Sequence, residues 1–253
     1  MEKTGSVYAT PDEIRDFENL IPPGRSRLSR PAIKYELSRG NIIMNPYDEA
    51  SVGSNGIDVT LGEHMWSEIP TVSGGSRVLN PFDFNEVKQH WQLTQPINAG
   101  EYMDKHGTLN GISRSARIFL IEPGVLYLGH TDQFIGGTRC VSSDMHARSS
   151  VGRNGITVCK CADQGGVGFF NRWTMEISNQ MSCAVILAVG MRIAQISFEM
   201  VDTVGGADYV SGGGKYQSSN RLEELIKSWT PMQLLPRLDR DREVQNGFAT
   251  SHS

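Results

Sequence analysis

The chain has 253 residues, with 24 Lys and Arg against 28 Asp and Glu and a formal net charge of −4. That length is enough to bury a hydrophobic core, and the negative balance argues against a general electrostatic grip on nucleic acid. The sequence contains no apolar run of about 18 residues and no signal-peptide pattern, so it predicts a soluble cytoplasmic protein, in the host cytoplasm if viral, without membrane or nucleic-acid partners.

The N-terminal part predicts two helices and one strand. Thr10-Pro11-Asp12-Glu13 is a capping box with proline at the first helical position, and a second helix is expected from Arg30 to the stop at Gly40. Residues 57–61 alternate as a strand does. Residues 66–116 are poorly patterned, so they predict long loops or an insertion with scattered strands.

The second half predicts short strands separated by turns. Strands at 118–121 and 125–128 flank Pro123-Gly124, and the same design recurs around Gly190, so two hairpins are expected. This pattern indicates an all-β fold with a few short helices. The glycine-rich segment 205–216 should be mobile, a helix is expected at about 220–229, and the tail from Arg237 should be disordered.

The four cysteines, Cys140, Cys159, Cys161 and Cys183, are too few for a disulfide scaffold and are expected to be reduced, buried thiols. Cys159 and Cys161 would share one core-facing side of a strand. A zinc deaminase needs His-x-Glu followed by Pro-Cys-x-x-Cys, and neither element is present. The sequence therefore predicts no catalytic zinc.

Two clusters carry the candidate chemistry. Arg148, Ser149, Ser150 and Arg153 place two guanidiniums and two hydroxyls within six residues, which indicates an anion site. Further along, residues 173–179 alternate with period two, so Glu176 would share a strand face with Thr174 and Ser178 while Met175 turns toward a core. A carboxyl held on rigid backbone beside such donors suits proton transfer.

These motifs resemble a known family. Arg148-Ser149-Ser150-Val151-Gly152-Arg153, then Thr174-Met175-Glu176-Ile177-Ser178-Asn179 and Gly190-Met191, are similar to the dCTP deaminases of the dUTPase-like superfamily. The resemblance covers roughly residues 29–217, leaving a 1–28 extension, a 66–116 insertion and a 218–253 helix and flexible tail. It implies a distorted jelly-roll or β-clip barrel that forms a homotrimer with active sites at subunit interfaces.

The implied reaction is hydrolysis of dCTP to dUTP and ammonia, with Mg²⁺ held by the substrate phosphates and dUTP or dTTP as further ligands. Glu176 would be the general acid and base. Ser149 and Arg153 would position water and stabilise charge at C4. Substrate contacts would come from Arg148, Ser150, Thr174 and Met175, from the Ala162 carbonyl, and from Tyr209 and Lys215 at the phosphates.

One departure from the family pattern bears on the sugar. The family usually carries an aspartate that holds the deoxyribose 3′-hydroxyl, where this chain has Gly165-Gly166, with Asp163 a few residues early. Losing a charge-assisted hydrogen bond costs about 1.5–3 kcal/mol. Three alternatives therefore stay open: a deaminase that also cleaves the triphosphate to dUMP or a dUTPase-like pyrophosphatase, a modified cytosine substrate, and a catalytically silent nucleotide-binding trimer.

Overall fold

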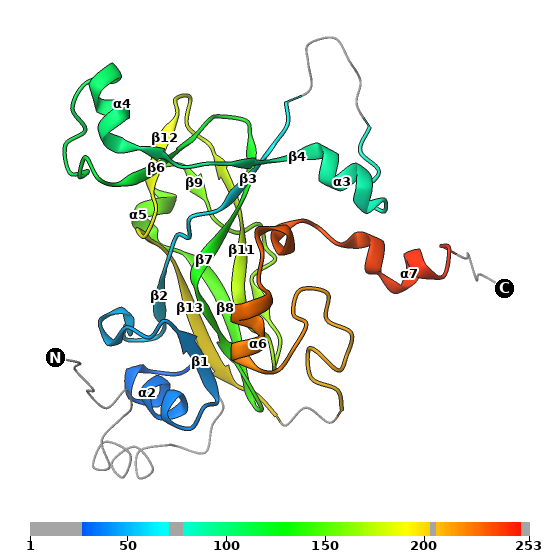
Figure 1. The fold of residues 1–253 in the computed structure, drawn as a ribbon. Helices are drawn as coiled ribbons and strands as arrows, with labels where there is room; N and C mark the ends of the chain where they lie inside the picture. The colour runs from blue at the N-terminus through cyan, green and yellow to red at the C-terminus, as the bar shows by residue number, and fades with distance from the viewer. Residues whose placement is uncertain (1–26, 71–77, 203–205, 249–253) are drawn as a thin grey trace.

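The structure is a computed structural model that describes residues 27–70, 78–202 and 206–248. The helix predicted after Thr10 lies outside these residues. The described chain is rich in β-strands with a few short helices, as predicted (Figure 1). Across these ranges, every helix is too short or too polar to cross a membrane.

The strands, in chain order, are β1 (Ile42–Asn45), β2 (Ile57–Thr60), β3 (Met65–Glu68), β4 (Trp91–Thr94), β5 (Ile97–Asn98), β6 (Arg117–Ile121), β7 (Leu126–Gly137), β8 (Val141–Ala147), β9 (Ile156–Thr157), β10 (Gln164–Gly165), β11 (Phe170–Asn179), β12 (Val185–Ala188) and β13 (Arg192–Met200). The α-helices are α2 (Arg30–Ser38), α3 (Phe84–His90), α4 (Ala99–His106), α5 (Ser149–Gly152), α6 (Leu222–Ser228) and α7 (Arg242–Gln245). Short 3₁₀ helices are η1 (Glu49–Ser51), η2 (Pro231–Leu234) and η3 (Leu238–Arg240).

Three antiparallel sheets organise the described residues. The largest has the order β4-β3-β7-β11-β9, with β1 also paired to β7. The second runs β10-β8-β13-β2, and the third runs β12-β6-β5. The main hydrophobic core takes buried residues from strands of all three sheets. β7 is the longest strand and pairs with β11 over most of the length of β11, so this pair is the backbone of the largest sheet.

The two predicted hairpins are wrong in their pairing. β6 and β7 flank the turn at Gly124 but join different sheets, and β12 and β13 do the same at Gly190. Gly124 (φ 74°) and Gly190 (φ 82°) have the left-handed backbone that glycine adopts without strain. Alternation and turn residues identified these strands but carry no information about which neighbour each one pairs with, so each turn moves the chain from one sheet to another.

The helix predicted from Arg30 is confirmed as α2, with Gly40 at φ 68° just after it. Within 66–116 the short strands β4 and β5 agree with the predicted scattered strands, whereas the helices α3 and α4 were not predicted. The predicted C-terminal helix is confirmed as α6. The chain from Arg237 to Phe248, predicted to be disordered, contains η3 and α7.

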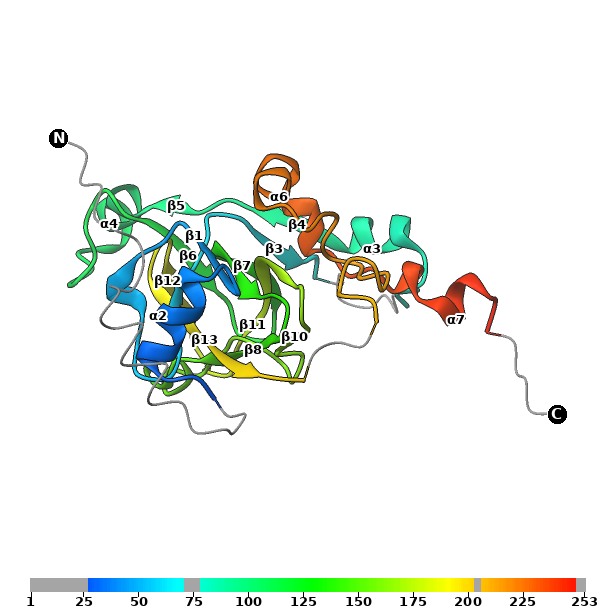
Figure 2. The same ribbon diagram turned by 90° about the horizontal axis from the view of Figure 1, so that it is seen from below.

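The C-terminal segment returns to the insertion. Figures 1 and 2 both show α7 at the same end of the molecule as α3. The Arg237 guanidinium lies 3.9 Å from the centroid of the Phe84 ring, and the rings of Phe82 and Phe248 are 4.9 Å apart. Two parts of the chain that are remote in sequence therefore pack together there.

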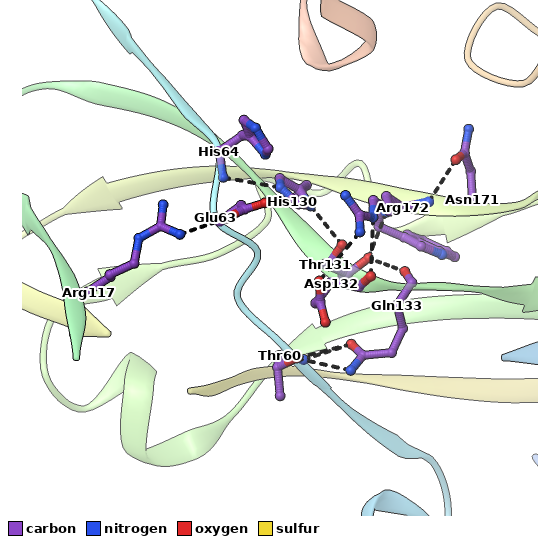
Figure 3. Close-up of polar contacts among 11 residues, drawn as sticks. Thr60, Glu63, His64, Arg117, His130, Thr131, Asp132, Gln133, Asn171 and Arg172 are labelled. Atoms are coloured by element: carbon purple, nitrogen blue, oxygen red, sulfur yellow. Dashed lines mark hydrogen bonds and ion pairs between the residues drawn. The ribbon is translucent and has the colours of Figure 1, made fainter. Parts of the chain in front are cut away.

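A buried histidine fixes the start of β3 against β7. His130 is fully buried, its Nε2 accepts a hydrogen bond from the backbone N of His64 at 3.2 Å, and its Nδ1 lies 2.8 Å from the carbonyl oxygen of Thr131 (Figure 3). Nδ1 therefore carries the proton and donates it to that carbonyl. Burial lowers the pKa of His130 to about 4, so the ring is neutral at physiological pH.

Replacing Gly62 by alanine should destabilise the fold, because a Cβ at Gly62 would overlap the His130 ring, which is held by hydrogen bonds on both nitrogens. Overpacking of this kind costs about 1–3 kcal/mol. Thermal unfolding followed by circular dichroism should show a lower Tm for Gly62→Ala. Gly166→Ala is the matched control, since a Cβ there has no neighbour within 4 Å. Equal Tm values for the two variants would contradict this packing.

Candidate active site

A pocket of about 470 Å³ opens on one face of the largest sheet. Strand β11 contributes Thr174 and Glu176 to it, and β7 contributes Leu126 and Leu128. The burial of β11 alternates as predicted, with Trp173, Met175 and Ile177 buried and the residues between them partly exposed. The period-two pattern therefore placed Glu176 on the correct face.

Glu176 sits in a mostly apolar part of this pocket. Leu128 of β7 is its cross-strand neighbour, and the Oε2 of Glu176 accepts a hydrogen bond from the backbone N of Lys160 at 3.3 Å. Loss of water around the carboxyl raises the pKa of Glu176, and the Lys160 hydrogen bond opposes this shift only in part. A carboxyl whose pKa is raised in this way holds a proton more readily than an exposed one, which suits a group that both accepts and returns a proton.

The loop between β9 and β10 passes in front of this acid. Ala162 lines the pocket, as predicted from the family pattern, and Lys160 donates from its backbone. The predicted strand through Cys159 and Cys161 is wrong, because β9 ends at Thr157 and Cys161 has a left-handed φ of 61°. Cys161 is exposed rather than buried, as is Cys183. The loop meets the carboxyl through the backbone N of Lys160.

The glycine-rich segment folds back onto the pocket. Tyr209 lines it, with its ring 5.0 Å from that of Phe169, and its hydroxyl accepts a hydrogen bond from the backbone N of Tyr216 at 3.3 Å. Burial raises the pKa of Tyr209. Gly214 packs so closely on the Tyr209 ring that a Cβ there would overlap it. Residues 209–216 therefore have a defined place over the site.

Two predicted contacts lie elsewhere. Lys215 does not line the pocket, and its ammonium pairs with Asp241 instead of facing open space. The Met175 side chain is fully buried in the core, so only its main chain can face a ligand. Strand alternation alone excludes a side-chain role for Met175.

The donor cluster lies on a different surface of the chain. Ser149 and Ser150 are in α5, Arg153 follows it, and none of these lines the pocket that contains Glu176. Arg148 donates to the carbonyl oxygen of Arg192 at 3.3 Å and lies 3.8 Å from Asp58. Within one chain, the structure does not bring these four residues to the acid.

The family's missing aspartate has no substitute at its own position. Asp163 does not line the pocket, whereas the next residue, Gln164, does. Gly165 is packed against Trp173 and Ser143 too closely to carry a side chain, while Gly166 faces open space. Gln217, which the sequence did not place clearly, is buried: it donates to the carbonyl of Gly168 and accepts from the N of Phe170, both at 2.8 Å.

Sequence reasoning missed Arg172. Arg172 lines the pocket and lies two residues before Thr174, so the period-two pattern would place it on the same strand face. A β-bulge lies between the two residues. The Arg172 guanidinium lies 4.5 Å from the Trp229 ring centroid and donates to the carbonyl of Asp132 at 3.2 Å (Figure 3). Burial lowers the pKa of Arg172, with Asp132 opposing that shift. Trp91 and Trp229 also line the pocket, and neither follows a pattern that could have indicated it.

Fold and site together define a β-rich protein with a desolvated acid in a pocket of small-molecule size. The sequence model of the dCTP deaminase-like family matches residues 27–201. A protein of Leptospira biflexa named "dCTP deaminase, dUMP-forming" is 30% identical over 164 residues, covering 65% of this chain and 90% of that one. One of Methanosphaerula palustris with the same name is 24% identical over 185 residues, covering 73% and 87%.

Among solved structures, the 2′-deoxycytidine 5′-triphosphate deaminase of Agrobacterium tumefaciens has a TM-score of 0.49 and 16% sequence identity, over 70% of this chain and 48% of that chain. The family match alone spans more than half of the sequence. This chain therefore belongs to the dCTP deaminase-like family, a family of enzymes.

The raised pKa of Glu176 predicts a pH-dependent effect on stability. Between the unfolded pKa near 4.5 and the higher folded pKa, the folded state binds more protons than the unfolded state. The free energy of unfolding therefore falls as pH rises through that window, and the loss persists at higher pH. Glu176→Gln removes this term while keeping an acceptor for the Lys160 N–H. The Tm of the variant minus that of the parent should be larger at pH 8 than at pH 4, and an unchanged difference would contradict the desolvation.

Proposed function

We propose that this protein hydrolyses the amino group of dCTP, giving dUTP and ammonia, with Glu176 as the general acid and base. The observation that carries this proposal is the position of Glu176, a desolvated carboxyl on a rigid strand inside the pocket. Membership of the dCTP deaminase-like family supports the choice of substrate.

The proton steps balance with one carboxyl. Glu176 accepts a proton from water as the oxygen attacks C4 of cytosine, and it delivers that proton to N3. The tetrahedral carbon then carries both a hydroxyl and the amino group. Glu176 takes the hydroxyl proton and passes it to the amine, the C4–N bond breaks, and ammonia leaves as the C4 carbonyl forms. The Ala162 carbonyl would hold the water or the amino group, and Thr174 would contact the base.

The α5 donors would complete the site from a neighbouring copy. Arg148, Ser149, Ser150 and Arg153 lie away from Glu176 within one chain, which supports the homotrimer with shared sites that the family resemblance implies. Ser149 and Arg153 of one copy would then stabilise charge at C4 in the site of the next, with Arg148 and Ser150 nearer the triphosphate. Mg²⁺ would arrive with the substrate, bound to its phosphates.

A second product remains a specific candidate. The relatives from Leptospira biflexa and Methanosphaerula palustris are named as dUMP-forming, which favours further cleavage of the triphosphate. The glycines at 165 and 166 weigh against it, because the resemblance assigns the sugar contact to a carboxylate that this chain lacks there. Chromatography of the products from dCTP and Mg²⁺ separates dUTP from dUMP.

Glu176→Gln should abolish ammonia release while retaining nucleotide binding, because the amide keeps the shape of the side chain but cannot carry the proton. We expect kcat to fall by at least about 10²-fold, the scale of general acid–base catalysis. Coupled detection of ammonia measures kcat, and calorimetric titration with dCTP measures binding. Glu101→Gln, on an exposed face of α4, is the control. Equal ammonia release by Glu176→Gln and the parent would rule out Glu176 as the acid and base, whereas nucleotide binding without ammonia release from the parent would favour a nucleotide-binding module instead.

Shared sites predict complementation between two inactive variants. Glu176→Gln and Arg153→Ala, each inactive alone, should regain about a quarter of parental activity when co-expressed in equal amounts, since one site in four then pairs an intact Glu176 with an intact Arg153 from a neighbour. Activity of the purified mixed oligomers is the measurement. Glu176→Gln co-expressed with the double variant provides the control, and no recovery in the test mixture would mean that each chain builds its own site.

A further inference from the structure

The insertion and the C-terminal segment together build one side of the pocket. Trp91 comes from β4 of the insertion, and Trp229 and Leu234 come from the chain beyond residue 201, where the family match ends. Trp66 Nε1 donates to the carbonyl oxygen of Pro231 at 2.8 Å, which ties the C-terminal segment to β3. We call Trp91, Trp229 and Leu234 the pocket wall.

The pocket wall is a packed surface rather than a loose flap. Trp91 and Leu234 belong to one apolar cluster with Val87, Leu128 and Leu235, and Trp229 packs against it. Trp91 is 7% exposed and Leu234 is 3% exposed. Side chains held in this way cannot move aside cheaply, because each has close neighbours on its far side. The wall therefore sets the shape of the pocket.

The pocket wall lies close to the acid. Leu128 is the cross-strand neighbour of Glu176 and also packs in the cluster that contains Trp91 and Leu234. Within the wall, Trp229 has the Arg172 guanidinium 4.5 Å from its ring centroid, so that end of the wall suits a phosphate. Trp91 and Leu234 pack in an apolar cluster and cannot compensate the desolvation of a phosphate, so the part of a nucleotide that meets these two residues is the base. Of the edges of cytosine, N3, O2 and the amino group need polar partners, whereas the C5–C6 edge carries only C–H groups.

We propose that the pocket wall receives the C5 edge of the pyrimidine and sets the largest 5-substituent that the enzyme accepts. This inference rests on the proposed function, since it places C4 of the base at Glu176. C5 is bonded to C4, so orienting the amino-bearing carbon toward Glu176 brings the C5 edge to the adjoining wall. Base selection would then depend on two segments outside the strands that carry the acid.

The test compares the rates at which the parent and variants of the pocket wall deaminate 5-substituted nucleotides. Ammonia release from dCTP, 5-methyl-dCTP and 5-iodo-dCTP would be measured for the parent, Leu234→Ala and Trp91→Leu. Each shortened side chain should raise kcat/KM for 5-iodo-dCTP relative to dCTP by about tenfold or more, the discrimination that a change of this size in an apolar pocket supports. Leu234→Val provides a milder variant if Leu234→Ala folds poorly.

Met103→Ala is the matched control for loss of stability. Met103 is buried in α4 of the same insertion, in a separate apolar cluster, and does not line the pocket. Its truncation should lower Tm by an amount comparable with Leu234→Ala and leave the ratio between the two nucleotides unchanged. A similar change in the ratio for Met103→Ala would overturn the inference, because general loosening would then account for it.

Binding separates this inference from the proposed function. Calorimetric titration of Glu176→Gln, with and without Leu234→Ala, would compare the Kd values of dCTP and 5-iodo-dCTP without turnover. If the parent releases no ammonia from any of the nucleotides, the proposed function fails, while a shift in relative Kd still supports the wall's role. An active parent whose wall variants leave both kcat/KM and Kd ratios unchanged would overturn the inference alone.

Discussion

Strand β11 is held along most of its length by β7, and the candidate site depends on that pairing. It places Glu176 beside Leu128, with Trp173 and Met175 anchored in the core on the opposite face. The carboxyl is thereby partly withdrawn from water, and the backbone N of Lys160 donates a hydrogen bond to it. A desolvated acid lowers stability in its charged form, and the raised pKa of Glu176 expresses that cost.

The side chains around Glu176 come from several parts of the chain, some inside the family match and some beyond its end. The central strands and the Ala162 loop lie within the family match, whereas Tyr209, Tyr216 and Trp229 lie beyond its end. The insertion adds Trp91 through the contacts of β4 and α3 with the C-terminal segment. Glu176 and the side chains that shape the pocket around it therefore come from separate stretches of sequence that pack against one another.

Local patterns in the sequence were sufficient to predict the positions of β11, α2 and α6, because alternation, capping and glycine stops act over a few residues. They also placed Glu176 and Thr174 on one face. They did not predict the partners of β6 and β12, since sheet pairing depends on contacts remote in sequence. Arg172 was within reach of the same alternation, but Trp91 and Trp229 were not, because their place in the pocket follows from tertiary packing alone. Nor did they predict that α5 and Glu176 lie apart within one chain, since that too follows from tertiary packing.

The Gln217 side chain holds the far end of the segment that lies over the pocket. Its amide nitrogen donates to the carbonyl of Gly168, and its amide oxygen accepts a hydrogen bond from the backbone N of Phe170, where β11 begins. The backbone N of Tyr209 is bonded in turn to the carbonyl of Val167 at 3.1 Å. With residues 209–217 fastened at both ends, much of the conformational entropy of this glycine-rich stretch has been given up on folding. A ligand that arrives beneath it meets a largely preorganised cover and loses correspondingly less affinity to ordering the chain.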